Sequence, residues 1–453
     1  MPLGETIVAQ GTPQGESAIA AIRLSGPLVP QLFKEIFGIE NVVWRKAYYR
    51  SYKSIKKDKI DEVIVIPYPK RSSYTGEESL EIYPHGNPLI CRLIIDDLVS
   101  RGCRLAIPGE FTRTAFVNGK MELTQAEAVA DLIHARSLKS ISYAQKQLSG
   151  NLGSRIIELR QLLLQIMALV EAYIDFPEED LPLEQPEGPY QKLLGLQSEL
   201  KALLDTYQYR EFLQNGLSLS ILGQPNAGKS SLLNSLMGED RAIVSDQPGT
   251  TRDYIQENLF VGDYPVRIAD TAGLREGQSE IEILGIEKSM NYAKDSDIIL
   301  LVIDSSTLIA PSFDASVLSL LEQKPVLIVE NKSDLALEPD WLDGYRVKSD
   351  WVRVSTLTGD GISELREKLE KTIDHLADQF GNEEMIINAR HQGVLSDCLS
   401  HVEVSIQGIE TKIGVELVSQ DLRLALSFLS QVVGEDDNEE MLDHLFAQFC
   451  IGK

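Results

Sequence analysis

The pattern of hydrophobic and polar residues changes several times along the chain, and each change marks a different kind of local structure. Up to about residue 118, short apolar runs with strand-like alternation are separated by helix-like stretches and by Gly and Pro turns. Strands are expected over Ile19 to Leu24, Glu62 to Pro67 and Ser79 to Tyr83. This mixture predicts an α+β domain over residues 1–118.

Past this first domain the apolar residues recur at the spacing of an amphipathic helix, which predicts the start of a helical bundle. Thr124 and Glu127 have the spacing of a capping box at the first helix. The apolar stripe of a longer helix consists of Ile156, Leu159, Leu163, Ile166, Met167, Val170 and Tyr173. Prolines and acidic residues in 175–189 indicate an exposed connection, and a further helix over Leu193 to Phe212 is expected to end at Gly216.

A third pattern, in which apolar strands alternate with helical segments, occupies residues 216–380. The expected strands are 217–223, 264–270, 297–304, 324–331 and 351–355. Near-continuous apolar strands of this kind predict a parallel sheet that is covered on both faces. Helical periodicity then returns, at Val394, Leu417, Leu422, Leu426, Leu429, Met441 and Leu445. The simplest architecture inserts an α/β domain (216–380) into a helical domain formed by residues 119–215 and 381–453.

Composition agrees with a chain of several globular domains. At about 150 residues per domain, 453 residues suggest about three domains. The formal charge is 43 − 68 = −25, whereas a protein that wraps nucleic acid is normally basic. Any RNA contact is therefore expected to be local or shared with a partner. Residues 44–59 carry seven basic residues among Trp44, Tyr48, Tyr49 and Tyr52, a pattern that suits RNA but more often marks an exposed polar hairpin.

The cysteines and the first residues bear on the compartment. No two of the four cysteines form a C-x-x-C pair, so neither a structural zinc site nor a disulfide framework is indicated. The first 14 residues lack the basic start and apolar core of a signal peptide, and the apolar runs are too short for a membrane span. A cytosolic location is expected. Cys450 is either a reactive thiol or a buried small apolar residue, and we slightly favour burial.

Residues 223–230 (GQPNAGKS) fit the phosphate-binding pattern G-x-x-x-x-G-K-[ST], after an apolar strand and before a helix. The glycines allow backbone N–H groups to turn towards phosphates, and the helix N-terminus and Lys229 add positive charge. The Ser230 hydroxyl is a candidate Mg²⁺ ligand. A chance glycine-rich turn is the alternative, and motifs further along the chain reduce its weight.

Two more motifs follow expected strands. Asp270-Thr-Ala-Gly273 stands where a carboxylate can organise the Mg²⁺ shell and a glycine N–H can reach a γ-phosphate. Asn331-Lys-Ser-Asp334 supplies a carboxylate that can accept both the N1–H and the amine hydrogens of guanine, a pattern that adenine lacks. Residues 354–356 are expected to complete the base pocket. Three motifs in this order predict a Ras-like P-loop domain that binds GTP.

Residue chemistry alone leaves several candidates for the catalytic machinery. Residues 249–253 (GTTRD) form the natural switch loop, in which the Thr251 hydroxyl can join Mg²⁺. Leu274 stands where Ras-like proteins place a water-orienting glutamine, so another residue must do this, and Glu276, Glu280 and Glu282 all stay open. Asn226 is a candidate ligand for a monovalent cation, together with backbone carbonyls of 245–250.

The whole chain resembles the bacterial and organellar tRNA-modification GTPases. Besides the GTPase motifs, the residues that carry the resemblance are 108–112 (PGEFT), 115–116 (AF), 118–120 (NGK), 125–131 (QAEAVAD), 270–276 (DTAGLRE) and 449–453 (FCIGK). The resemblance implies an N-terminal folate-binding and dimerisation domain, a helical domain built from both flanks, and an inserted G domain. These implied domains agree with the boundaries expected from periodicity.

The resemblance also implies roles for single residues. Glu282 matches the family's water-orienting glutamate, and the potassium ligands match Asn226, Ser245, Gln247 and Thr250, with potassium replacing an arginine finger when two G domains meet. The folate-binding positions match Arg23, Glu81, Lys120 and Lys453. The full set expected to contact the nucleotide and its ions is Asn226, Ala227, Gly228, Lys229, Ser230, Ser231, Ser245, Asp246, Gln247, Pro248, Gly249, Thr250, Thr251, Asp270, Thr271, Ala272, Gly273, Asn331, Lys332 and Asp334.

The function that the resemblance implies is GTP hydrolysis coupled to modification of C5 of the wobble uridine in tRNA. The one-carbon unit would come from 5-formyl- or 5,10-methylene-tetrahydrofolate, and a homodimer of this chain would act with an FAD-dependent partner subunit in a heterotetramer. Two rivals remain: a ribosome-assembly or regulatory GTPase, and a folate-dependent aminomethyltransferase acting alone. The first would usually carry a small RNA-binding module, and the second would need no GTP site.

Overall fold

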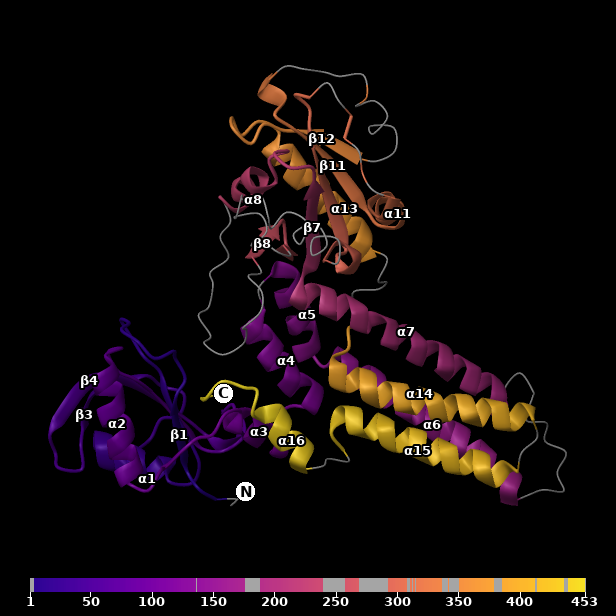
Figure 1. The fold of residues 1–453 in the computed structure, drawn as a ribbon. Helices are drawn as coiled ribbons and strands as arrows, with labels where there is room; N and C mark the ends of the chain where they lie inside the picture. Colours follow the sequence, from indigo (N-terminus) through magenta and orange to yellow (C-terminus); the bar gives the residue numbers. More distant parts are fainter. Residues whose placement is uncertain are drawn as a thin grey trace. The chain divides into compact units, whose positions relative to one another are not determined.

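The structure of the protein is a computed structural model (Figure 1). It describes residues 4–135, 137–175, 188–238, 257–268, 292–307, 310–311, 313, 315–335, 341, 350–378, 385–411, 414–435 and 439–452. The chain divides into two compact units. The first unit contains Met1–Ile133, Lys146–Ser198 and Gly393–Lys453, and the second contains His134–Gln145 and Glu199–Gln392. The boundaries at 118, 215 and 380 stay a prediction.

The N-terminal part of the first unit is a six-stranded sheet in the order β3-β4-β5-β2-β1-β6, antiparallel except for the β1–β6 pair. Its elements are β1 (Ile7–Gln10), β2 (Ile22–Ser25), α1 (Val29–Phe37), β3 (Tyr48–Lys53), β4 (Lys59–Tyr68), η1 (Lys70–Ser72), β5 (Ser79–Tyr83), α2 (Pro88–Ser100) and β6 (Arg104–Leu105). The expected α+β class is confirmed. The prediction missed β1, β3 and β6, and β2 begins at Ile22 because Ile19 is exposed.

Alternation along the strands gives this sheet two different faces. Val8, Ile22, Leu24, Leu80 and Ile82 are buried in one core together with residues of α1 and α2. Because successive side chains point to opposite faces, Arg23 and Glu81 lie on the other face. One face of the sheet is therefore committed to the core, and the other carries the polar residues that matter for chemistry.

The remaining helices of the first unit follow the expected helical periodicity. They are α3 (Glu110–Val117), α4 (Leu123–His134), α6 (Asn151–Asp175), the first part of α7 (Pro189–Asn215), α14 (Ala389–Glu410), α15 (Val415–Val433) and α16 (Glu439–Phe446). α6 and α15 lie side by side (Figure 1). Arg160 of α6 donates to Ser430 Oγ of α15 at 3.0 Å, and Ile156 and Leu163 are fully buried.

The predicted capping box of α4, with Thr124 as the capping residue, is wrong because the helix begins before Thr124. The helix begins at Leu123, and the side chain of Gln125 accepts a hydrogen bond from the Glu122 N–H at 3.0 Å. Thr124 lies inside the helix and is buried, so its hydroxyl does not cap. Leu123 is itself a core residue, and its burial places the first turn earlier than the Thr124–Glu127 spacing suggests.

The second unit contains a six-stranded sheet in the order β12-β11-β10-β7-β9-β8. Its strands are β7 (Leu217–Gly223), β8 (Glu257–Val261), β9 (Tyr264–Ile268), β10 (Ile298–Asp304), β11 (Val326–Asn331) and β12 (Asp350–Arg353). All neighbouring pairs are parallel except β8–β9, so the expectation of a wholly parallel sheet is wrong at one edge. Sequence reasoning missed β8, which pairs with β9 as a hairpin through a short turn.

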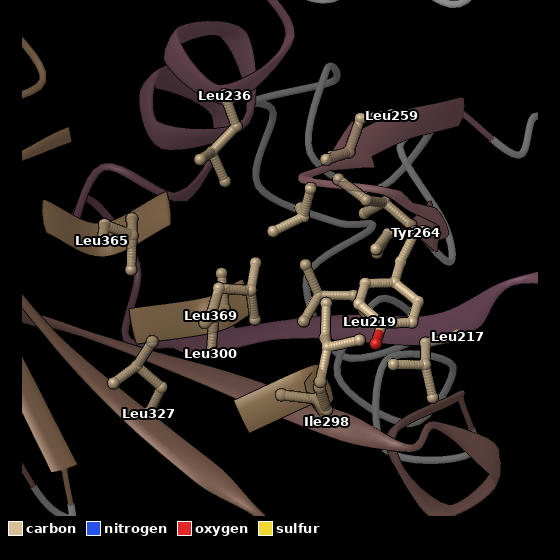
Figure 2. Packing of buried hydrophobic residues seen from close by; sticks show 14 of the residues in the cluster. Leu217, Leu219, Leu236, Leu259, Tyr264, Ile298, Leu300, Leu327, Leu365 and Leu369 are labelled. Atoms are coloured by element: carbon tan, nitrogen blue, oxygen red, sulfur yellow. The ribbon is translucent and has the colours of Figure 1, made fainter. Parts of the chain in front are cut away.

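Helices cover both faces of this sheet, as expected for an α/β domain. The helices and the short helical turn described here are α5 (Leu138–Leu148), the end of α7, α8 (Lys229–Met237), α11 (Ala315–Gln323), η2 (Ser333–Leu335) and α13 (Ile362–Asp378). Ile298 and Leu300 of β10 pack with Leu236, Leu365 and other residues in one core (Figure 2). The alternate residues of β10 pack with residues of α11 in a second core on the other face.

α7 ends where the sequence predicts, at Gly216. The Gly216 N–H donates to the Phe212 carbonyl at 3.0 Å, and its φ of +72° is in the left-handed region that favours glycine. A Cβ at this position would lie 2.3 Å from the Pro265 carbonyl oxygen. The chain can therefore pass directly from α7 into β7. Within the described part of the chain, no helix combines the length and apolar character needed to cross a membrane.

Candidate functional site

The carboxyl ends of four parallel strands define one edge of the second unit's sheet. β7, β10, β11 and β12 run in the same direction, so the residues that follow them meet at this edge. In open α/β sheets this is where ligands bind. The predicted nucleotide-binding residues within the described ranges follow β7 or lie at and after the end of β11.

The loop after β7 has the backbone shape of a phosphate cradle. Asn226 and Gly228 have positive φ values of +61° and +96°, and α8 begins at the next residue. Lys229 Nζ donates to the carbonyl oxygens of Gly223 and Gln224, both at 2.9 Å, so its charge is held over the loop. Ser230 lies in the first turn of α8. A helix N-terminus and a lysine in this arrangement form an anion-binding site.

The loop is joined directly to the motif after β11. Asn331 is fully buried, and its Nδ2 donates to the Ala227 carbonyl oxygen at 2.8 Å. Its Oδ1 accepts from the Thr356 N–H at 3.2 Å. A Cβ on Gly228 would lie 2.0 Å from Asn331 Nδ2, so glycine is required here by space as well as by φ. One amide therefore fixes the phosphate loop against the segment after β12.

Asp334, predicted to bind the base, is oriented by a residue of the segment after β12. Ser355 is fully buried and its hydroxyl donates to Asp334 Oδ1 at 2.7 Å. This bond leaves the second carboxylate oxygen of Asp334 available to accept from a base. The prediction that residues 354–356 complete the pocket therefore has a geometric basis in Ser355 and Thr356.

Asp304, at the end of β10, belongs to this edge and was missed by sequence reasoning. It accepts from Lys332 Nζ at 2.6 Å and from the Ser306 N–H at 2.9 Å. Burial alone would raise the pKa of Asp304, but the hydrogen bonds from Lys332 and Ser306 outweigh it and lower that pKa. The available signal was an acidic residue at the end of the most apolar strand. Asp304 holds Lys332, whose φ is +63°.

Several predicted residues lie outside the described residues. They are Ser245, Asp246, Gln247, Pro248, Gly249, Thr250, Thr251, Asp270, Thr271, Ala272, Gly273, Glu282 and Lys453. The last described residue before the Asp270 motif is Ile268, at the end of β9. Among the described residues, those predicted to bind Mg²⁺, potassium or phosphate include Asn226, Ser230 and Ser231, which lie within or next to the phosphate loop. Their predicted ligand roles stay predictions.

A second polar cluster lies on the open face of the N-terminal sheet. Arg23 and Glu81 are directly opposite each other on β2 and β5, with Arg23 Nε 3.3 Å from Glu81 Oε1. The hydroxyls of Tyr68 and Tyr83 donate to Glu81 Oε2 at 3.1 and 2.5 Å. Burial, the hydrogen bond to Glu81 and its charge raise the pKa of Tyr83. Sequence reasoning named Arg23 and Glu81 but missed the tyrosines.

The other two residues predicted to bind folate are Lys120 and Lys453. Lys453 is not described, but the carbonyl oxygen of the preceding Gly452 accepts from Arg23 Nη1 at 3.4 Å. Lys120 Nζ donates to the Arg71 carbonyl oxygen at 3.1 Å and makes no contact with Glu81. The structure thus brings Arg23, Glu81 and the C-terminal segment together, with Lys120 on a neighbouring loop.

The slight preference for a buried Cys450 is wrong. Cys450 is exposed, whereas Cys91, Cys103 and Cys398 are buried. The neighbouring Phe449 takes the buried position in the α16 core, which leaves Cys450 turned outward. Burial raises the pKa of Cys103 to about 11 and that of Cys398 to about 12, so those thiols are poor nucleophiles.

The fold and the joined nucleotide motifs define a P-loop GTPase with a guanine-specific base motif. The chain matches the family models "MnmE helical domain" over residues 123–450 and "GTP-binding protein TrmE N-terminus" over residues 6–120. It is 40% identical to the tRNA modification GTPase MnmE of Opitutus terrae over 100% of both chains. It is also 40% identical to that of Aquifex aeolicus, over 99% of this chain and 100% of the relative.

The chain therefore belongs to the MnmE family of tRNA modification GTPases, and it is a GTP hydrolase. Among solved structures, the G domain of the T. maritima FeoB iron transporter is similar at 22% identity. That similarity covers 34% of this chain and 97% of the FeoB chain, with a TM-score of 0.25. The resemblance found in the sequence is confirmed at the level of the family.

Proposed function

We propose that this chain couples GTP hydrolysis to modification of C5 of the wobble uridine in tRNA, producing an aminomethyl or carboxymethylaminomethyl group. The single structural observation behind the proposal is the bond from Asn331 to the Ala227 carbonyl, which holds the phosphate loop and the guanine motif in one frame. The names of the full-length relatives support the tRNA part, because they are tRNA modification GTPases. This function does not require the small RNA-binding module that a ribosome-assembly or regulatory GTPase would usually carry.

In the nucleotide site, Asp334 would accept from the N1–H and the amine of guanine, while Lys229 would move from the loop carbonyls to the phosphates. Mg²⁺, when bound, would neutralise charge on the β- and γ-phosphates. The residues fit that ion because the hydroxyls of Ser230 and Thr251 are hard oxygen donors. The Ser230 hydroxyl belongs to the first turn of α8, next to Lys229.

Potassium is the proposed substitute for an arginine finger. Asn226 is exposed in the phosphate loop and has a positive φ, so its side-chain oxygen is accessible from outside the loop. Ser245, Gln247 and Thr250 would complete the oxygen set, which suits a hard cation. Two G domains of a homodimer would meet over this surface, and Glu282 would orient the attacking water.

The cluster on the N-terminal sheet is the proposed site for 5-formyl- or 5,10-methylene-tetrahydrofolate, which would supply the one-carbon unit. Arg23 Nε is buried and makes no hydrogen bond within the described residues, although Glu81 lies 3.3 Å away. An unsatisfied buried donor beside a carboxylate fits a ligand with a polar ring edge. Glu81 would bind the pterin edge, and Lys120 and Lys453 would meet the glutamate tail.

The remaining parts of the proposal concern assembly and location. A homodimer would join an FAD-dependent partner subunit in a heterotetramer, and the partner would supply part of the tRNA surface because this chain has a formal charge of −25. The domain boundaries at 118, 215 and 380 belong to the same proposal. The assembly would work in the cytoplasm, where tRNA is available.

Nucleoside analysis of tRNA tests this function. In cells that lack the chain, the C5 side chain of the wobble uridine should disappear from digested tRNA, and the wild-type gene should restore it. Unchanged nucleosides together with defective ribosomal subunits would contradict the proposal and favour a ribosome-assembly GTPase. Restoration by a Lys229→Ala variant that no longer binds GTP would favour a folate-dependent transferase acting without a nucleotide.

A further inference from the structure

The basic segment of residues 44–59 forms an exposed hairpin at one edge of the N-terminal sheet. β3 is the terminal strand of the sheet and pairs only with β4 among the described residues. Ser54 and Asp58 close the turn between the two strands through a 2.9 Å backbone hydrogen bond. All seven basic side chains of the hairpin are exposed: Arg45, Lys46, Arg50, Lys53, Lys56, Lys57 and Lys59.

Most of these cations have no carboxylate partner. Lys59 pairs with Glu62 at 2.6 Å, while the other six form no ion pair within the described part of the chain. The acidic residues of β4 are already engaged, because Asp61 accepts from the backbone N–H of His85 and Glu62 also accepts from Ser51. In a chain with a formal charge of −25, six unpaired cations on one hairpin are a local positive surface.

Hydrogen bonds to α2 and to the residue that follows it hold the hairpin in place. Tyr52 is fully buried and its hydroxyl donates to Asp97 Oδ2 of α2 at 2.9 Å. The other oxygen of Asp97 accepts from the Ile55 N–H in the turn at 2.7 Å, and Arg101 donates to both Asp97 and the Lys53 carbonyl. A surface fixed in this way loses little conformational entropy when it binds a partner.

Exposed aromatic surface accompanies the charge. Tyr49 is 65% exposed near the start of β3, on the face of the sheet that also carries Ile64 and Tyr83. Aromatic rings beside cations provide stacking platforms for unpaired bases, whereas an acidic protein surface would not need them. This combination favours a single-stranded or looped nucleic acid over an acidic peptide.

The patch begins next to the Glu81 cluster. The Arg45 N–H donates to the Pro67 carbonyl at 2.7 Å, and Tyr68, the next residue, donates to Glu81. Burial and the neighbouring Glu81 raise the pKa of Tyr68, and the charge of Arg45 acts in the opposite direction. A nucleic acid that lay on the hairpin would therefore pass close to the proposed folate site.

We propose that this hairpin, through its six unpaired cations and Tyr49, is the surface on which the chain itself contacts the phosphates and an unstacked base of tRNA. The inference rests on the proposed function, since tRNA is the proposed substrate. It adds a contact surface in this chain to the surface expected from a partner subunit.

Binding of labelled tRNA to the full-length chain, measured at several salt concentrations, tests the inference. The variant Lys53→Gln/Lys56→Gln/Lys57→Gln should bind more weakly, and its plot of log affinity against log salt should be shallower by about 2 to 3. The matched control is Lys34→Gln/Arg92→Gln/Arg423→Gln, which removes three exposed cations that pair with acids elsewhere. Both variants have a formal charge of −25 − 3 = −28, so a difference between them cannot come from net charge.

A second pair of variants separates stacking from charge. Tyr49→Ala should lower tRNA affinity by about tenfold, while Tyr49→Phe should bind like the wild type, because stacking needs the ring and not the hydroxyl. GTP hydrolysis without tRNA should be unchanged in all these variants, and an unchanged circular dichroism spectrum and thermal unfolding midpoint would report that the N-terminal sheet still folds.

Three outcomes would overturn the inference: no tRNA binding by the wild-type chain, equal effects of the two triple variants, or loss of partner-protein binding with unchanged tRNA binding. The nucleoside assay distinguishes these from failure of the proposed function. If the wild-type gene restores the modified nucleoside while the hairpin variant binds tRNA normally, only the inference fails. If the wild-type gene restores nothing, the proposed function fails.

Discussion

At the residue scale, a few polar side chains hold the segments of the nucleotide site together. Asn331 uses its amide nitrogen on the phosphate loop and its oxygen on the Thr356 N–H. Asp334 is oriented by Ser355, and Lys332 by Asp304. These pairs separate the proposed base recognition by Asp334 from the contact between Asp304 and Lys332, which supports the same edge of the sheet.

Exchanging Asp334 for Asn should therefore change base choice. Asp334→Asn presents an N–H where guanine offers hydrogens, but that N–H can donate to the carbonyl of xanthine. The ratio of GTP to xanthosine triphosphate affinity should fall by at least about a hundredfold. Asp304→Asn is the control, because weakening the bond to Lys332 should lower both affinities equally. Competition binding with both nucleotides measures this, and an unchanged ratio in Asp334→Asn would place base recognition elsewhere.

A single sequence can identify the residues whose roles come from contiguous motifs, but not those whose roles depend on contacts between strands. Lys229, Ser230, Asn331 and Asp334 belong to contiguous motifs whose positions after strands can be predicted from apolar periodicity. Asp304 and the tyrosines around Glu81 act through pairing between strands. Strand order and register decide those contacts, and a single sequence does not contain them. The outward position of Cys450 likewise depends on which neighbour of a short helix becomes buried.

At the scale of elements, Tyr264 links the strand before the Asp270 motif to two helices. Tyr264 lies at the start of β9 and is 2% exposed, with its ring in the core beside Leu217 and Ile298 (Figure 2). Its hydroxyl donates to Asp374 of α13 at 2.6 Å, and Lys139 of α5 contacts the same hydroxyl. The ammonium of Lys139 also lies 4.3 Å from the ring centroid. α5 is thus fastened to β9 within the second unit.

Removing the Tyr264 hydroxyl should loosen α5. Tyr264→Phe keeps the ring in the core but loses bonds worth about 1 kcal/mol, so amide hydrogen exchange across α5 should become about fivefold faster. Tyr207→Phe is the control, because that hydroxyl bonds to Glu211 within α7. Mass-spectrometric exchange measures both variants. Equal protection of α5 in Tyr264→Phe and the wild type would show that the hydroxyl does not hold the helix.

At the scale of the whole molecule, the chain combines a GTPase sheet with a second polar cluster on a separate sheet. The sequence predicted these parts because each has its own periodicity, and the family match over the full length agrees. The acidic charge of the chain is interrupted by the basic hairpin of residues 44–59. These features together describe a GTPase of the tRNA-modification family with a local positive surface on its N-terminal sheet.

The central claim is that this chain hydrolyses GTP with a potassium ion and Glu282 in place of an arginine finger and a Ras-type glutamine. The most direct test is the steady-state rate of GTP hydrolysis by the purified chain in KCl and in NaCl at equal ionic strength. The wild type should be at least about tenfold faster in KCl, and Glu282→Ala should lose hydrolysis in both salts while still binding GTP. Equal rates in the two salts, or a Glu282→Ala variant that hydrolyses GTP normally, would contradict the account.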